Sequence, residues 1–94
     1  MKPRKEWRAS YNCHEIKVIY TWINNLQLLI DGELKDEVNI KAVIGFSEDV
    51  FLTSSVTSEN GANLTVEVLV KPTFWSIEIR IRVAGNEIGS EVRE

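Results

Sequence analysis

Two stretches late in the chain alternate strictly between apolar side chains and mostly polar ones. Their apolar members are Leu64, Val66, Val68 and Val70 in the first stretch and Ile77, Ile79, Ile81 and Val83 in the second. A β-strand sends successive side chains to opposite faces of its sheet. Each stretch therefore predicts a strand with one buried face and one wet face.

The same alternation recurs upstream, over residues 14–22, 26–30, 38–46 and 50–56, and a further short strand is expected at residues 7–10. About seven or eight short strands separated by turn residues are typical of a sandwich or barrel. We predict one all-β domain over residues 1–94, an antiparallel β-sandwich or flattened barrel. Its expected core contains at least one tryptophan and Ile16, Val18, Leu28, Ile44, Leu52, Val66, Val68, Ile79 and Ile81.

Residues 33–42 fit two structures. Leu34, Val38 and Ala42 are also spaced for one face of a helix, and the charged residues among them favour a helix. Asparagine and β-branched residues in the same stretch oppose it. We predict an extended segment and keep a short helix as the alternative.

Turn residues predict the register of two hairpins. A three-residue loop over 59–61 sets Val56 opposite Leu64, whereas a two-residue turn would set a core residue opposite a surface residue. In the same way, a three-residue loop over 30–32 sets Leu28 opposite Leu34. Each loop ends on a glycine, which supplies the left-handed conformation that this geometry needs.

Charge predicts the register of a third hairpin. Pairing Val70 with Ile77 places Glu67 opposite Arg80, whereas a slip of two residues would oppose Glu67 to Glu78. Like charges directly opposite each other destabilise a sheet, so we expect the first register.

The net charge of −3 is unevenly spread along the 94 residues. Residues 1–8 carry four cations against one carboxylate, a local +3 that leaves −6 on the remainder. We expect residues 1–6 to form a flexible basic tail. A nucleic-acid binder shows a broad basic face, so no nucleic-acid partner is expected. No apolar run is long enough for a membrane span or a signal peptide, which predicts a cytoplasmic protein with no membrane contact.

Cys13 and His14 are the only cysteine and histidine. Adjacent residues of a strand face opposite ways, so a reactive thiol–imidazole pair is not expected there. The expected structure is instead a small buried cysteine before a histidine that begins a strand. One cysteine and one histidine are too few for a zinc site within one chain. There is no Gly-x-Ser-x-Gly elbow and no phosphate-binding glycine loop. We predict no catalysis, no cofactor and no metal.

Acidic residues gather in two places, and they leave calcium binding open as an alternative. They are Asp31, Glu33, Asp36 and Glu37 in the first and Glu48 and Asp49 in the second. Calcium prefers several loop oxygens, but the Asp-x-Asp-x-Asp-Gly pattern is absent. Hairpin turns select aspartate for backbone reasons alone.

Aromatic residues are the strongest functional lead. Phe74 and Trp75 lie in the connection between the two clearest strands, just after Pro72, which stops strand pairing. Large apolar groups in a connection can anchor a partner protein or a sugar ring. They can also fold back and close the open end of the sandwich. The candidate binding residues are Phe74, Trp75, Trp22 and Tyr11.

Several landmarks of the chain resemble the domains of the Fas apoptotic inhibitory molecule family. They are Trp7, the strand His14-Glu15-Ile16-Lys17-Val18, the hairpin Leu29-Ile30-Asp31-Gly32-Glu33, and Glu78-Ile79-Arg80-Ile81 before Gly85-Asn86-Glu87. The resemblance implies a compact β-sandwich without enzymatic activity that acts through protein contacts. The chain is similar to one such domain, where the family typically carries two.

We therefore predict a noncatalytic protein-interaction module that binds an unknown protein partner through an edge strand or the Phe74-Trp75 loop. One alternative is a carbohydrate-binding module with Trp7, Tyr11, Trp22 and Trp75 as ring platforms. Another is a structural unit that associates with itself.

Overall fold

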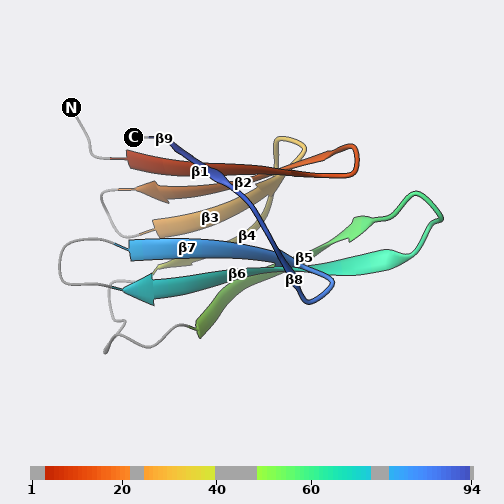
Figure 1. Ribbon diagram of the computed structural model, residues 1–94. Helices are drawn as coiled ribbons and strands as arrows, with labels where there is room; N and C mark the ends of the chain where they lie inside the picture. The colour runs from red at the N-terminus through yellow and green to blue at the C-terminus, as the bar shows by residue number, and fades with distance from the viewer. Residues whose placement is uncertain (1–3, 22–24, 40–48, 73–76, 94) are drawn as a thin grey trace.

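Two antiparallel sheets face each other in the computed structural model (Figure 1). The structure describes residues 4–21, 25–39, 49–72 and 77–93. One sheet has the order β4-β3-β2-β1-β9 and the other β5-β6-β7-β8. The strands are β1 (Arg4–Tyr11), β2 (His14–Thr21), β3 (Asn25–Ile30), β4 (Glu33–Asn39), β5 (Asp49–Thr57), β6 (Asn63–Pro72), β7 (Ile77–Val83), β8 (Asn86–Ile88) and β9 (Glu91–Arg93). The sheets do not close into a barrel, so of the two predicted architectures the sandwich is confirmed. In the described part of the chain, no helix is long and apolar enough to cross a bilayer.

The core lies between the sheets and is made by the alternation seen in the sequence. Every predicted core residue within the described residues is buried, and Ile44 lies outside them. The tryptophan of the core is Trp7, which is 3% exposed. Each fully buried aliphatic side chain stabilises the fold by about 1.5–3 kcal/mol relative to an exposed one.

Strand β4 confirms the extended prediction for residues 33–39, while residues 40–42 lie outside the described residues. The prediction that residues 1–6 form a flexible tail is wrong for residues 4–6. Residues 4–6 are part of β1 and pair with residues 19–21 of β2. The basic character of this segment did not prevent pairing: Lys5 is on the same face as the buried Trp7 but is itself only half-buried, near the end of the strand.

The hairpin between β5 and β6 has the predicted register. Val56 lies opposite Leu64. The amide of Ser58 donates to the carbonyl of Ala62 at 2.8 Å, which closes the three-residue loop. Gly61, in third place, has a φ of 86°, the left-handed conformation that such a loop requires.

The predicted loop over 30–32 is wrong. Asp31 and Gly32 form a two-residue turn in which both have positive φ, and Ile30 lies opposite Glu33. The additional residue that the three-residue loop would have supplied is instead accommodated by a bulge in β4. Beyond the bulge the register is shifted by one residue, so that Leu28 lies opposite Asp36 and Leu26 lies opposite Val38. The bulge restores the match between apolar faces that the short turn alone would lose.

The predicted register of β6 and β7 is also wrong, by two residues. Val70 lies opposite Ile79, and Glu67 lies opposite Arg82 rather than Arg80. This register also sets Lys71 opposite Glu78. Two opposite-charge pairs form instead of the single pair in the predicted register, which favours the observed one. The Arg82 Nε–Glu67 Oε1 ion pair is 2.9 Å long.

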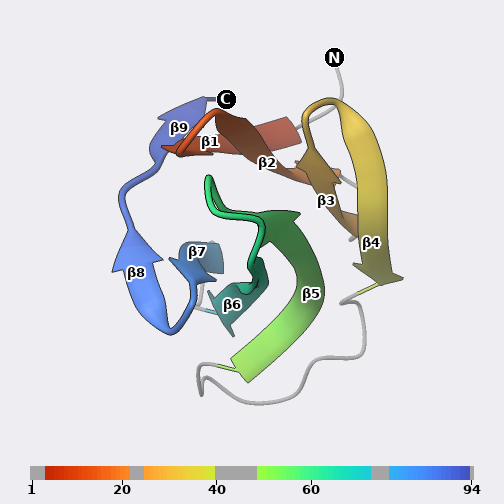
Figure 2. The ribbon, with the colours of Figure 1, turned by 90° about the vertical axis from the view of Figure 1, so that its right-hand side faces the viewer.

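The chain changes sheets near its end. Figure 2 shows β8 and β9 on one side of the sandwich but in different sheets, with β4 and β5 on the opposite side. Strand β8 pairs with β7, and β9 pairs with β1, where Val92 lies opposite Trp7 and Glu91 opposite Arg8. Had the chain continued along β7 in register, Ser90 would lie opposite Ile79 and Glu91 opposite Glu78. Because the chain crosses to the other sheet, these two unfavourable pairs do not form. In their place, β9 and β1 form an apolar pair, Val92 with Trp7, and an opposite-charge pair, Glu91 with Arg8.

Candidate functional site

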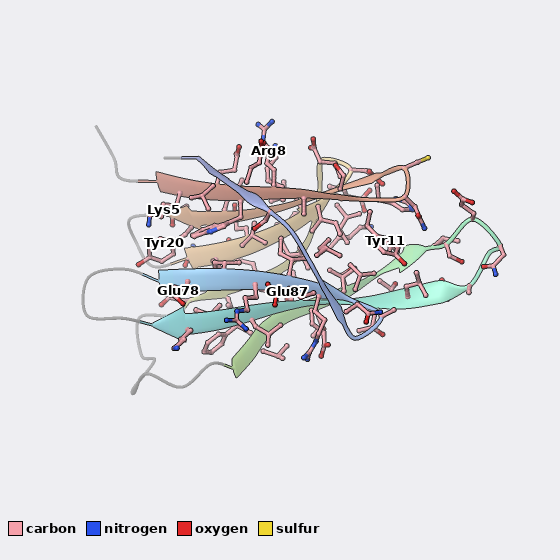
Figure 3. The ribbon with its side chains drawn as sticks, in the orientation of Figure 1. Lys5, Arg8, Tyr11, Tyr20, Glu78 and Glu87 are labelled. Atoms are coloured by element: carbon pink, nitrogen blue, oxygen red, sulfur yellow. The ribbon has the colours of Figure 1, made fainter. Side chains whose placement is uncertain are left out.

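The structure places one of the four candidate binding residues. Tyr11, at the end of β1, is half-buried and packs against the core (Figure 3). Trp22, Phe74 and Trp75 lie outside the described residues. Trp7, the further platform of the carbohydrate-binding alternative, is wrong in that role because its side chain is buried in the core.

Asp36 connects β4 and β5, the edge strands of the two sheets on one side of the sandwich. Its Oδ1 accepts a hydrogen bond from the amide of Glu37 at 2.9 Å, and its Oδ2 accepts one from the amide of Thr53 at 3.0 Å. One carboxylate thus binds edge amides of both sheets. The bulge in β4 places Asp36 there, and bulges and inward-pointing charges are two ways in which proteins protect sheet edges from unwanted strand pairing.

His14 makes a second connection between the sheets on β5. Its Nδ1 lies 2.8 Å from Asp31 Oδ2, and its Nε2 lies 2.9 Å from the carbonyl oxygen of Thr57. Asp31 Oδ1 in turn accepts a hydrogen bond from the amide of Glu15 at 3.0 Å. The turn that carries Asp31, the start of β2 and the end of β5 are therefore joined by one imidazole ring.

Neither partner of the His14 ring can donate a proton to it. A carboxylate and a carbonyl only accept hydrogen bonds, so both contacts form together only when both ring nitrogens carry hydrogen. The hydrogen bond to Asp31, followed by that to Thr57, raises the pKa of His14 above its usual value. The bond to His14, followed by that from the Glu15 amide, lowers the pKa of Asp31.

Cys13 departs from the sequence prediction. It is exposed in the turn before β2, whereas a buried position was expected. A two-residue turn has no buried face, and Asn12, in its first position, has a positive φ. The ring nitrogens of the neighbouring His14 contact Asp31 and Thr57, so the site shows no thiol–imidazole pair among its hydrogen bonds.

We expect the stability supplied by His14 to depend on pH. Because its folded pKa is raised, the contribution is fully present below about pH 6.5, the usual histidine value, and is lost as pH rises through the folded pKa. Because the folded pKa of Asp31 is lowered, its contribution is present above the usual carboxyl value and is lost as pH falls through the folded pKa. The stability difference between the wild type and His14→Ala, from chemical denaturation, should therefore be larger at pH 5.5 than at pH 9.

An NMR titration of the His14 ring provides the control for this prediction. The ring should titrate above pH 6.5 in the wild type and closer to that value in Asp31→Asn. A His14 ring that titrates at or below 6.5 in the wild type, or an equal stability difference at the two pH values, contradicts the prediction.

The opposite side of the sandwich contains an open strand edge. The amide of Ala84 donates to the carbonyl of Thr65 at 2.9 Å, which continues the β6–β7 register. Backbone groups alternate in direction along an antiparallel strand, so the even-numbered residues of β7 bond to β6 and Ile79 points away from it. Strand β8 covers only residues 81–83 of β7. In the described part of the chain, no strand pairs with residues 77–80 on that side, and Figure 1 shows β8 leaving β7 there.

Charged side chains flank this open edge. Ile79 is buried, whereas Glu78 and Arg80, on the outer face, are exposed. Arg80 Nη1 lies 3.8 Å from Glu87 Oε1 on β8, and both side chains are more than half exposed. Figure 3 shows Glu78 and Glu87 along the same outer face. The edge therefore has a backbone donor and acceptor at Ile79 together with one charge of each sign, of which Glu78 lies opposite Lys71 on β6 and Arg80 lies near Glu87 on β8.

An open hollow of about 510 Å³ lies beside β1, where the chain passes from β8 to β9. Its lining includes Arg8, Ser10, Glu15 and Glu91. Arg8 Nε lies 2.8 Å from Glu6 Oε2, an ion pair on the outer face of the sheet.

Within the described residues, no three histidine, cysteine, aspartate or glutamate side chains are grouped as metal ligands. Comparisons with protein-family models, with curated proteins and with solved structures give no match to this chain.

Proposed function

We propose that this chain is a noncatalytic protein-interaction module that binds an extended segment of a partner protein along the open edge of β7. The observation that carries the proposal is that, among the described residues, no strand pairs with the backbone of Ile79 on the side where β8 ends. An extended peptide that adds to a sheet edge gains affinity from main-chain hydrogen bonds and specificity from the neighbouring side chains.

The contrast between the two sides of the sandwich supports this choice of edge. On β5, the outward-facing amide of Thr53 and carbonyl of Thr57 are bonded to Asp36 and His14. On β4, the bulge and the bonded amide of Glu37 oppose the addition of a strand. On β7, by contrast, none of the described strands pairs with Ile79 on the side away from β6.

In the sequence, the aromatic pair comes shortly before this strand. Residues 73–76, which include Phe74 and Trp75, connect directly to Ile77 at the start of β7. We propose that the two binding features predicted from the sequence, an edge strand and the aromatic loop, serve one partner. The family resemblance implies the same class of function and stays a prediction.

Amide hydrogen exchange tests the proposal. Peptides are first selected from a displayed library of extended sequences, and exchange is then measured by NMR with and without a selected peptide. We expect the Ile79 amide to exchange roughly tenfold more slowly when the peptide is bound, the factor that corresponds to about one added hydrogen bond. The amide of Arg80, which points to β6, provides the internal control and should change little.

Ser55 provides a control on the opposite side. It lies between Thr53 and Thr57 on β5, so its backbone also faces outward. Selected peptides that slow the exchange of Ser55 rather than Ile79 would show that the wrong edge has been assigned. If no selected peptide slows Ile79, the proposed function is wrong.

A further inference from the structure

The same three-residue pattern, an acid, an apolar residue and an arginine, occurs on two strands that border the open side of the sandwich. Strand β1 carries Glu6-Trp7-Arg8 and β7 carries Glu78-Ile79-Arg80. In both strands the apolar side chain is buried, and the arginine projects from the outer face, as Figure 3 shows for Arg8.

The first of these patterns is already occupied by a strand. Strand β9, with the sequence Glu91-Val92-Arg93, runs antiparallel to β1 and sets Glu91 opposite Arg8, Val92 opposite Trp7 and Arg93 opposite Glu6. The molecule therefore contains one example of the segment that such an edge accepts. The sequence of that segment is an acidic residue, a β-branched apolar residue and a basic residue.

We propose that the open edge of β7 selects a partner segment with this same sequence pattern. The segment runs antiparallel to β7, with its acid opposite Arg80, its apolar residue opposite Ile79 and its base opposite Glu78. This proposal rests on the proposed function and specifies the chemistry of the partner. Opposite charges on facing positions set the register and direction of a strand.

The chain's own sequence explains why β8 does not continue into this place. In register, the next residues after Ile88 would set Ser90 opposite Ile79 and Glu91 opposite Glu78. In that register Glu91 could not lie opposite Arg80, and Val92 could not lie opposite Ile79. A separate segment has no such constraint, because it can begin opposite Arg80, beside the point where Gly89 leaves the sheet.

Two synthetic peptides of equal composition test the pattern. One has the sequence of residues 91–94, Glu-Val-Arg-Glu, so that its first residue can lie opposite Arg80 without overlapping β8, and the other exchanges the acid and base around valine, Arg-Val-Glu-Glu. NMR titration of the whole chain should show the first peptide binding several-fold more tightly, since each exposed pair changes affinity by about two- to fivefold. The largest shifts and the slowed amide exchange should centre on Ile79.

A charge-exchanged protein gives the matched control. In the double variant Glu78→Arg with Arg80→Glu, the preference between the two peptides should reverse. Both positions are exposed, and Arg80→Gln alone should reduce the preference without reversing it. Circular dichroism of each variant establishes that it is folded before it is titrated.

The other possible outcomes contradict the sequence pattern, the assignment to β7 or the proposed function. Equal binding of both peptides at Ile79 overturns the sequence pattern and leaves the proposed function standing. Shifts centred on Trp7 and Arg8 show that the peptide replaces β9 on β1, which also overturns the assignment to β7. If neither these peptides nor library-selected ones protect Ile79, the proposed function fails together with the pattern.

Discussion

Ile81→Ala is expected to lower the free energy of unfolding by about 2–5 kcal/mol, the range for truncation of a buried isoleucine. Ile81 is 0% exposed. It lies opposite Val68 on one side and Ile88 on the other, so the cavity would form at the centre of its sheet. In a domain of this size each kcal/mol lowers the melting temperature by roughly 4–8 °C. Chemical denaturation and a thermal melt both measure the effect.

Two graded controls show whether burial is the cause. Ile81→Val removes one methylene group and should cost about 0.5–1.5 kcal/mol. Leu34→Ala, at a leucine that is 51% exposed, should cost less than about 1 kcal/mol. A loss at Leu34 as large as the loss at Ile81 contradicts the assignment of the core.

Gly32→Ala is expected to destabilise the fold by about 1–2 kcal/mol, the cost of a left-handed conformation for a residue with a Cβ. Gly32 has a φ of 82°, and nothing lies within 4 Å of the place its Cβ would take. The loss therefore comes from backbone conformation and not from a clash. The same turn carries Asp31, so the NMR titration of His14 should also move towards its ordinary pKa.

Gly89→Ala is the matched control for this prediction. Gly89 also has open space around it, but its φ is outside the left-handed range. Its replacement should change stability by no more than about 0.5 kcal/mol in either direction. Equal effects of the two substitutions, measured by urea denaturation, would show that the turn conformation has been assigned wrongly.

The buried faces of β2, β3, β5, β6 and β7 were predictable from the sequence because side-chain direction has a period of two, whatever the neighbouring strand does. Val66, Val68, Ile79 and Ile81 are buried as expected. The loop over 59–61 was predictable for a similar reason, since its local geometry needs Gly61. Apolar alternation and the chemistry of this loop are properties of short segments, and both agree with the fold, whereas the loop predicted over 30–32 does not.

Register was predicted less well, because pairings that differ by two residues present the same faces. The β6–β7 pair moved by two residues to the register in which both Glu67 and Lys71 face opposite charges. The Asp31-Gly32 turn has two residues, and a bulge in β4 shifts the register by one residue so that apolar positions of β3 and β4 lie opposite each other again. A bulge can be placed at several positions, and the sequence around Asp36 contained no signal that selected one.

The candidate site depended on contacts between segments far apart in the sequence. Asp36 meets Thr53, and His14 meets Thr57, only when two sheets are stacked in one particular way. Likewise, none of the described strands covers Ile79 on the side away from β6, because the chain leaves β7 after Ile88 and pairs with β1 instead.

By itself, the sequence determined the all-β class, the buried faces of β2, β3, β5, β6 and β7 and a large part of the core, since these follow from local periodicity. Tertiary structure alone decided that the edges of β4 and β5 are capped and that, among the described residues, no strand covers residues 77–80 of β7 on the side away from β6. The physical reason is that an edge is defined by the absence of a neighbour, and neighbours are chosen by long-range pairing of charge and apolar surface.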